Sequence, residues 1–324
     1  MRNLIYQCFL KLDNQVQPHL SPERYGGNVS SVQDLYDDIA LVSSESFRKY
    51  AEHIGCEYEL DTERTFTNGY GRHGASAIYE WIKIIYDKKY DEYDTIAVFD
   101  LDVVPNTREN IFEASYCEYY GVNESDWLTE ERLMTFAGVW DKTPFILHQY
   151  IDKFARHGTT IKPIKKGERG SKTDSARLHF QGGMNVFTKE GRLKAREQFS
   201  PWYEWLFEGN HNFDPKKVLH PTNYDDTYIS ANVIDSDIDW EIIDHKWLDA
   251  PMNFHDPVTA WKDIKFGHFC GGYDKRCMLS FAHDGLIPYC TEYKNHPDRK
   301  ISYMDWTKRS VTVYMKKEEP ESFS

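Results

Sequence analysis

The chain has 324 residues, of which 40% are hydrophobic and 15% aromatic, and this abundance of packing groups excludes a disordered protein. Its net charge of −13 argues against a surface that attracts nucleic acid or anionic lipid as a whole. The six cysteines are scattered without a CxxC pair, no signal peptide is evident and no apolar run suits a membrane anchor, so we expect reduced thiols and a cytoplasmic location.

Strand and helix signals alternate along the first hundred residues. In chain order we predict a strand over 3–12, a helix over 32–54, a strand over 56–60, a helix around 78–89 and a strand over 95–99. Gly55 lies where the C-terminal cap of the first helix belongs. This alternation predicts an α/β fold with an open, mostly parallel sheet flanked by helices, in which ligands bind beyond the carboxyl ends of the strands.

The organisation changes after Pro105. Residues 178–187 read LHFQGGMNVF and predict a strand interrupted by a glycine pair, which usually marks a bulge or a close approach to the backbone. We also predict a helix over 192–207, a strand over 239–243 and a frayed polar tail from about Asn295.

One segment departs from the acidic character of the chain. Lys153 to Arg177 contains eight basic and two acidic residues. We interpret it as a solvated loop, because runs of charge are usually surface. The alternative is a lid over a diphosphate or a contact to an anionic acceptor such as nucleic acid.

The most informative pattern is TIAVFDLDVVP, residues 95–105, in which an apolar strand ends at Asp100 and Asp102. In an extended chain alternate side chains point the same way, so both carboxylates can reach one hard cation. The pattern therefore predicts a metal site at the end of a central strand.

Three stretches together resemble glycosyltransferases of the GT-A fold, most of all the glycogenin-like retaining enzymes. They are YEWIKIIYDKKYDEYDTIAVFDLDVVP (79–105), HFQGGMNVF (179–187) and GHFCGGYDK (267–275), and the resemblance covers residues 1–290 in patches. It implies a GT-A (Rossmann-like), mostly parallel mixed sheet. It also implies a nucleotide-sugar-binding half over 1–110, an acceptor-binding half over 111–294 with the basic segment inserted at 153–177, and a polar tail over 295–324.

The resemblance also implies roles for individual residues. The metal ligands would be Asp100, Asp102 and His268; the donor would be contacted by Asp100, Gly183, Gly271 and Lys275; and the catalytic groups would be Gln181, Asp225 and Asp226. Mixed carboxylate and imidazole ligands favour Mn²⁺ over Mg²⁺. The implied reaction moves a sugar from a nucleotide-diphosphate donor, most simply a UDP-sugar, to an acceptor hydroxyl with retention. Asp225 and Asp226 are equally well explained as the start of a helix.

Two other interpretations remain open at this point. VFDLDVVPNT also resembles the first motif of haloacid-dehalogenase-type phosphatases, with Asp100 as nucleophile, Asp225-Asp226 as a distal Mg²⁺ motif and Lys189 as the phosphate-neutralising lysine. The chain could also be a non-catalytic protein that binds a nucleotide or a structural metal ion.

Overall fold

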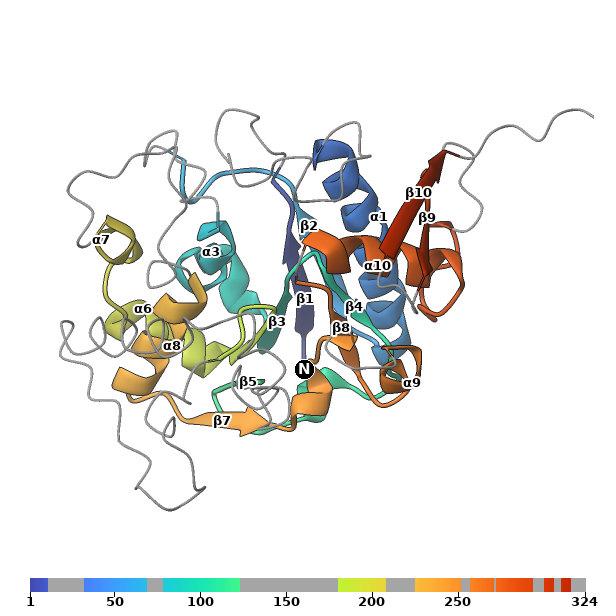
Figure 1. Cartoon of the computed structure of the whole chain (residues 1–324). Helices are drawn as coiled ribbons and strands as arrows, with labels where there is room; N and C mark the ends of the chain where they lie inside the picture. The colour runs from blue at the N-terminus through green and yellow to red at the C-terminus, as the bar shows by residue number, and fades with distance from the viewer. Residues whose placement is uncertain are drawn as a thin grey trace, which may run out of the picture. The chain divides into compact units, whose positions relative to one another are not determined.

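The computed structural model describes residues 1–10, 32–68, 78–122, 180–207, 225–251, 257–270, 272–293, 300–305 and 310–315 (Figure 1). The basic segment Lys153 to Arg177 and Gly271 lie outside these residues. The chain divides into two compact units, and each is built from stretches that are separated in sequence. The two are described in turn as the first and the second unit.

The first unit is organised around a mixed sheet. Its strands are β1 (Asn3–Cys8), β2 (Glu57–Asp61), β3 (Thr95–Phe99), β5 (Tyr119–Val122), β6 (Met184–Thr188) and β7 (Trp240–Ile243). Among the described residues the spatial order is β2-β1-β3-β6-β5-β7. β1 runs parallel to β2 and β3, and β5 runs parallel to β7, whereas β6 is antiparallel to both of its neighbours. The predicted α/β fold with an open, mostly parallel sheet flanked by helices is confirmed.

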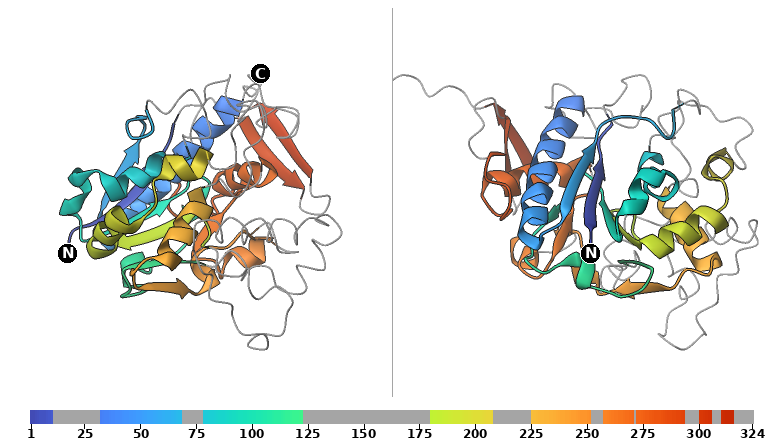
Figure 2. Two further views of the ribbon diagram at one scale, coloured as in Figure 1. Left: turned by 90° about the vertical axis from the view of Figure 1, so that its left-hand side faces the viewer. Right: turned by 180° about the vertical axis from the view of Figure 1, so that it is seen from behind.

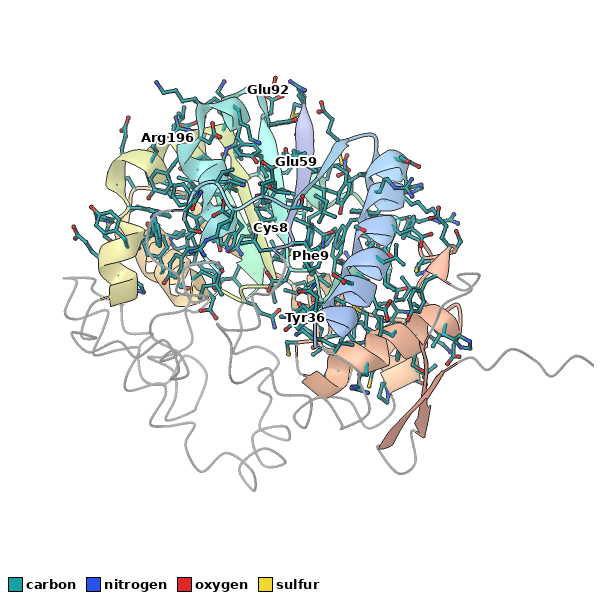
Figure 3. All side chains as sticks on the ribbon, turned by 90° about the horizontal axis from the view of Figure 1, so that it is seen from above. Cys8, Phe9, Tyr36, Glu59, Glu92 and Arg196 are labelled. Carbon is teal, nitrogen blue, oxygen red and sulfur yellow. The ribbon has the colours of Figure 1, made fainter. Side chains whose placement is uncertain are left out.

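Helical segments of the first unit gather beside this sheet. They are η2 (Glu80–Ile82), α3 (Lys83–Tyr86), η3 (Lys88–Glu92), η4 (Ile111–Glu113), α6 (Lys189–Gln198), α7 (Trp202–Phe207), α8 (Asp225–Asp235) and η8 (His245–Trp247). Figure 1 and the view from behind in Figure 2 both show α3, α6 and α8 together on one side of β1 and β3. Figure 3 shows side chains filling the space between these layers, with Arg196 of α6 and Glu59 of β2 labelled.

The central strand β3 is buried along most of its length. Ile96, Ala97, Val98 and Phe99 expose 3% of their surface or less. A continuous apolar run of this kind is expected for a strand that is covered on both faces. β3 therefore provides a rigid base for the residues that follow it.

The helix predicted around residues 78–89 is broken into short pieces. Asp87 adopts an extended conformation with ψ of 120°, and its side chain accepts a hydrogen bond from the backbone N–H of Lys89. This cap ends α3 and starts a separate 3₁₀ turn. The apolar spacing was read correctly, because Ile82 and Ile85 are fully buried in the core of the first unit.

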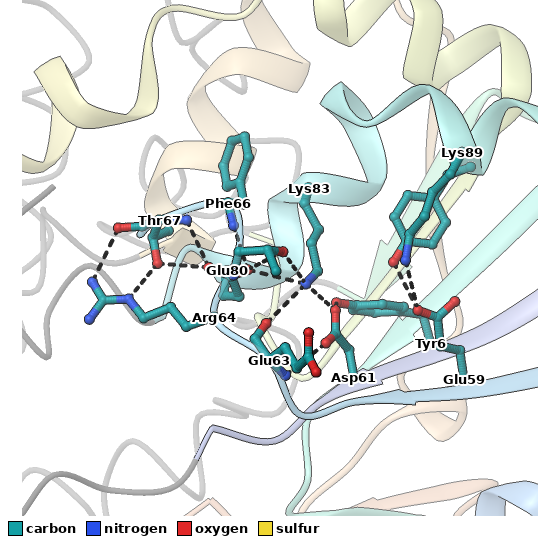
Figure 4. Close-up of polar contacts among 12 residues, drawn as sticks. Tyr6, Glu59, Asp61, Glu63, Arg64, Phe66, Thr67, Glu80, Lys83 and Lys89 are labelled. Carbon is teal, nitrogen blue, oxygen red and sulfur yellow. Dashed lines mark hydrogen bonds and ion pairs between the residues drawn. The ribbon is translucent and has the colours of Figure 1, made fainter. Parts of the chain in front are cut away.

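A buried charge cluster fixes the chain after β2. The carboxylate of Glu80, fully buried, accepts hydrogen bonds from the backbone N–H groups of Thr65, Phe66 and Thr67 at 2.7–2.8 Å (Figure 4). Lys83 lies 3.1 Å from Glu80 and also pairs with the carboxylate of Asp61. Burial alone would raise the pKa of Glu80, but these hydrogen bonds lower it below its usual value.

The second unit contains α1 (Val32–Ile54), β4 (Val103–Pro105), α9 (Pro257–Trp261), β8 (Phe266–His268), α10 (Gly272–His283), β9 (Lys300–Asp305) and β10 (Ser310–Met315). β4 pairs with β8, and β9 pairs with β10, in both cases antiparallel. α1 ends as predicted, because Gly55 has φ of +73°, a left-handed conformation that favours glycine. Phe47 stacks on Phe266 with ring centroids 5.9 Å apart, which packs α1 against β8.

Three further predictions about elements differ from the structure. The glycine pair Gly182-Gly183 forms a turn before β6 and does not interrupt a strand. The helix predicted over 192–207 is divided into α6 and α7 on either side of Pro201. Proline has no backbone N–H to donate to the preceding turn, and its ring clashes with that turn, so a helix does not continue through it. The predicted frayed tail contains the hairpin of β9 and β10. The units are discontinuous in sequence, so the division into donor and acceptor halves stays a prediction.

Among the residues that the structure describes, no helix combines the length and the apolar character needed to cross a membrane. The six cysteines all lie among the described residues, and they form no disulfide with one another.

Candidate metal centre

The turn after β3 carries the two aspartates of the Asp-x-Asp pattern. Asp100 directly follows β3, and its backbone N–H donates to the carbonyl of Gly183 at 3.2 Å. Gln7 of β1 donates to the carbonyl of Asp100 at 3.1 Å. The segment from Asp100 to Asp102 is a turn and not the extended chain that the sequence predicted, since β4 begins only at Val103.

Pairing of β4 with β8 brings Asp102 to His268 within the second unit. Val103 lies opposite His268 in the register, and the backbone N–H of Phe269 donates to the carbonyl of Asp102 at 2.8 Å. His268 Nε2 lies 3.4 Å from Asp102 Oδ1. Both side chains are buried, and Asp102 Oδ1 accepts no hydrogen bond from any described residue. A buried carboxylate oxygen beside an imidazole nitrogen is a donor pair that fits a divalent cation.

Gly267 makes this arrangement possible. A Cβ atom on Gly267 would lie 2.1 Å from the Trp261 ring, so no larger residue fits here without a shift of the ring or of β8. Trp261 is held in turn, because its Nε1 donates to the carbonyl of Leu286 at 3.0 Å. The close packing of the Trp261 ring against β8 therefore explains why glycine precedes His268.

Lys275 of α10 is the third charged group beside Asp102. Its ammonium group pairs with Asp102 Oδ2 and donates to the carbonyl of Cys270 at 3.1 Å. Burial alone would raise the pKa of Asp102, but Lys275 and His268 lower it well below its usual range. Burial would lower the pKa of Lys275, but the Asp102 carboxylate raises it. Both groups therefore stay charged at neutral pH.

The three predicted metal ligands each offer a suitable atom. Possible ligand atoms of Asp100, Asp102 and His268 lie within 4.8 Å of one another. Two carboxylates and an imidazole form a donor set that Mn²⁺ accepts readily and Mg²⁺ accepts less readily. The assignment of these residues to a metal stays a prediction.

The glycine turn lies beside the end of β3 in the first unit. β6 runs antiparallel to β3 with Met184 opposite Phe99, which places Gln181, Gly182 and Gly183 at the Asp100 end of the strand. Asn185 Nδ2 donates to the carbonyl of Gly182 at 3.0 Å and fixes the turn. Gln181 is 5% exposed, and its Oε1 is buried with no hydrogen-bond partner among the described residues.

Asp225 and Asp226 begin α8, and Asp226 packs on the glycine turn. A Cβ atom on Gly182 would lie 3.1 Å from Asp226 Cβ, so glycine allows this close approach. Trp81 Nε1 donates to Asp225 Oδ2 at 2.5 Å. Burial, followed by the negative charges of Asp226 and Asp100, raises the pKa of Asp225 well above its usual value. Asp225 and Asp226 start α8 and also form an acidic cluster with Asp100. A place at the start of a helix is therefore compatible with the predicted catalytic role, which stays a prediction.

Sequence reasoning missed several residues around these sites. Trp81 falls within the helix predicted around residues 78–89 and was given no role of its own, and neither was Asn185. Asp249 was also missed, although its carbonyl accepts from the backbone N–H of His268 at 2.9 Å. Trp81 and Asp225 lie 144 positions apart, and Asp249 lies 19 positions before His268, so no local sequence pattern connects either pair.

The geometry separates Lys189 from the Asp-x-Asp turn. Thr188 pairs with Thr95 at the start of β3, whereas Asp100 follows the end of the strand. At about 3.3 Å per residue, Thr188 lies roughly 17 Å from Asp100 along the sheet, and Lys189 follows Thr188. Lys189 is also exposed at the start of α6. It is therefore badly placed for the phosphate-neutralising role that the phosphatase interpretation requires.

Comparison with known proteins returns only structural neighbours. No protein-family model and no curated protein match the chain. A glycosyltransferase involved in glycosylation of the major capsid of PBCV-1 is 12% identical, with a TM-score of 0.41, over 86% of this chain and 98% of that chain. The galactosyltransferase LgtC, in complex with donor and acceptor sugar analogs, is 10% identical with a TM-score of 0.40, over 83% of this chain and 87% of that chain.

The apo structure of WbbM, a bifunctional glycosyltransferase, is 11% identical with a TM-score of 0.42. The match covers 91% of this chain and 51% of WbbM, so the chain spans about half of that protein. The solved structures named here are glycosyltransferases, and the closer likeness to glycogenin-type enzymes stays a prediction.

Proposed function

We propose that this protein is a metal-dependent glycosyltransferase that moves a sugar from a nucleoside-diphosphate donor to an acceptor hydroxyl. The observation that carries the proposal is the burial of Asp102 between His268 and Lys275, three residues after β3 ends at Phe99. Ligands of open α/β sheets bind beyond the carboxyl ends of such strands. A UDP-sugar is the donor that the sequence resemblance favours.

Breaking the bond between the anomeric carbon and the diphosphate leaves negative charge on the departing phosphate oxygens. A divalent cation held by Asp100, Asp102 and His268 would supply Lewis-acid stabilisation of that charge. Lys275 adds a permanent positive charge beside Asp102, where it can reach a phosphate oxygen. These groups lie where negative charge develops, which is how preorganised electrostatics accelerates a reaction.

The acidic cluster of the first unit suits the sugar and the acceptor. The raised pKa of Asp225 means that its carboxyl group holds a proton more readily than an ordinary aspartic acid, and the protonated group can donate a hydrogen bond to a hydroxyl. Asp226 offers a carboxylate beside Gly182, and the buried Oε1 of Gln181 can accept from a hydroxyl. We assign these residues to orienting the donor sugar and the acceptor, with retention of configuration following the sequence resemblance. The acceptor would be a glycan, a small molecule or a protein, and an anionic acceptor would use Lys153 to Arg177.

The proposal is tested by incubating the purified protein with UDP-sugars and Mn²⁺ and measuring UDP release. We expect metal-dependent hydrolysis that Asp102→Asn lowers at least about 100-fold, because one charged ligand is lost. Asp263→Asn, which alters an exposed carboxylate of the second unit, should keep full activity. Hydrolysis of p-nitrophenyl phosphate without turnover of any UDP-sugar would instead establish a phosphatase. Equal activity of Asp102→Asn and the wild type would refute the site.

A further inference from the structure

Lys275 and a divalent cation need the same carboxylate. The Lys275 ammonium occupies Asp102 Oδ2, and the other oxygen of that carboxylate faces His268 at 3.4 Å. Asp102, His268 and Lys275 are all buried, and each residue exposes 8% of its surface or less. A cation bound to Asp102 would therefore have a positive ammonium group as its immediate neighbour.

We propose that Lys275 competes with the metal for Asp102, so that the metal binds tightly only together with the diphosphate of the donor. This inference rests on the proposed function and adds to it an order of binding. Without a cation, the buried Asp102 carboxylate requires a counter-charge, and Lys275 supplies it. Lys275 is thus a positioning residue for the metal as well as a donor contact.

Electrostatic repulsion opposes the displacement of Lys275 from Asp102 by a metal ion alone. Two positive groups repel strongly in a buried site, where the effective dielectric constant is low. A metal ion that arrives alone must displace Lys275 from Asp102, and among the described residues the hydrogen bond to the carbonyl of Cys270 then remains to the ammonium group. The Tyr36 ring, whose centroid lies 6.0 Å from Lys275 Nζ, does not replace a full negative charge.

A diphosphate changes this balance. Its oxygens offer new negative partners for the ammonium group, and the flexible four-carbon stem of lysine allows the group to move from Asp102 toward them. Asp102 then becomes available to the cation. Because coupling between two ligands is reciprocal, the nucleotide must raise the affinity for metal by the same factor as metal raises the affinity for nucleotide.

The experiment measures Mn²⁺ binding by electron paramagnetic resonance of the free ion, with and without saturating UDP. For the wild-type protein we expect weak binding of Mn²⁺ alone and a Kd at least about 10-fold lower with UDP. Lys275→Met removes the charge and keeps much of the apolar stem, so Mn²⁺ alone should bind at least about 10-fold more tightly than to the wild type. The effect of UDP on the Mn²⁺ affinity should shrink.

Two matched variants control for other effects. Lys262→Met removes an exposed ammonium group from the same unit and should leave the Mn²⁺ affinity unchanged. Lys275→Arg keeps the positive charge, so Mn²⁺ alone should still bind weakly. If Lys275→Met does not fold by circular dichroism, Lys275→Gln provides the same loss of charge with a polar side chain.

The outcomes separate this inference from the proposed function. Unchanged or weaker binding of Mn²⁺ alone to the folded, neutral variants at position 275 would overturn the competition, even if the wild type hydrolyses UDP-sugars normally. A wild type that hydrolyses no UDP-sugar and binds Mn²⁺ equally with and without UDP would overturn both.

Discussion

At the scale of single residues, the tightest constraint in the second unit falls on Gly267. The Trp261 ring occupies the space that a side chain at this position would need, and Gly267 lies next to His268 in β8. Overpacking of a fitted core costs about 1–3 kcal/mol, because side chains and backbone must shift.

We therefore expect Gly267→Ala to lower the free energy of unfolding by about 1–3 kcal/mol and to weaken Mn²⁺ binding by displacing His268. Urea denaturation and metal titration measure the two effects. Replacing Trp261 by Leu removes part of the ring that fills this space. In the Trp261→Leu variant, Gly267→Ala should therefore lower the free energy of unfolding by less than it does in the wild type. Strict additivity of the two substitutions would contradict the proposed contact.

Residue by residue, the sequence identified groups with a recognisable context and missed those that act through tertiary contacts. Asp100, Asp102 and His268 were predicted as metal ligands because an acidic pair follows an apolar strand and a histidine stands in a glycine-containing segment, and this role stays a prediction. The ion pair of Lys275 with Asp102 could not be foreseen, since the two residues are 173 positions apart and no spacing connects them. The contact of Trp81 with Asp225 was hidden for the same reason.

At the scale of elements, α1 is fastened to the chain that follows α10 by one buried carboxylate. Glu45 Oε1 accepts from the backbone N–H groups of Thr291 and Glu292 at 2.8 and 2.9 Å, and Glu45 also pairs with Lys49. Burial alone would raise the pKa of Glu45, but Lys49 and these N–H groups lower it from 4.5 to about 2.

This shift predicts how stability depends on pH. The folded state holds the Glu45 proton less tightly than the unfolded state, so the stabilisation is fully present above pH 4.5 and is lost as the pH falls toward 2. The shift corresponds to about 3 kcal/mol. Glu45→Gln should therefore destabilise the protein by about 2–3 kcal/mol at pH 7, and the difference from the wild type should narrow between pH 4.5 and 3.

Urea denaturation at a series of pH values measures this difference. Glu52→Gln is the control, since Glu52 is an exposed carboxylate on the same helix, and it should change stability by less than about 0.5 kcal/mol. A gap between Glu45→Gln and the wild type that stays constant down to pH 3 would show that the charge of Glu45 is not the cause.

Elements with a regular apolar pattern were predicted well, whereas elements that depend on a side-chain cap or have a polar composition were not. The sequence placed α1 and β3 at the bounds the structure has, because hydrophobic spacing and the Gly55 cap agree there. The region of η2, α3 and η3 was read as one helix, because apolar spacing does not reveal that the Asp87 side chain caps a new turn. The hairpin of β9 and β10 was missed because its polar composition resembles a tail.

At the scale of the whole molecule, chain order and spatial organisation differ. Each compact unit collects segments that are distant in sequence, and within the second unit Asp102 and His268 meet although 166 positions separate them. The division into a nucleotide-sugar-binding half and an acceptor-binding half stays a prediction. Only the pairing of β4 with β8 explains their proximity, and β-strand pairing between distant segments leaves no local trace in the sequence.

The central claim is that Asp102 and His268 hold a divalent cation against the diphosphate of a nucleotide sugar. Crystals grown with Mn²⁺ and UDP, measured at the manganese absorption edge, test it most directly. We predict an anomalous peak within about 2.0–2.3 Å of an Asp102 oxygen and of His268 Nε2, in contact with the diphosphate. A diphosphate bound with no manganese on Asp102, or a manganese peak remote from His268, would contradict the account.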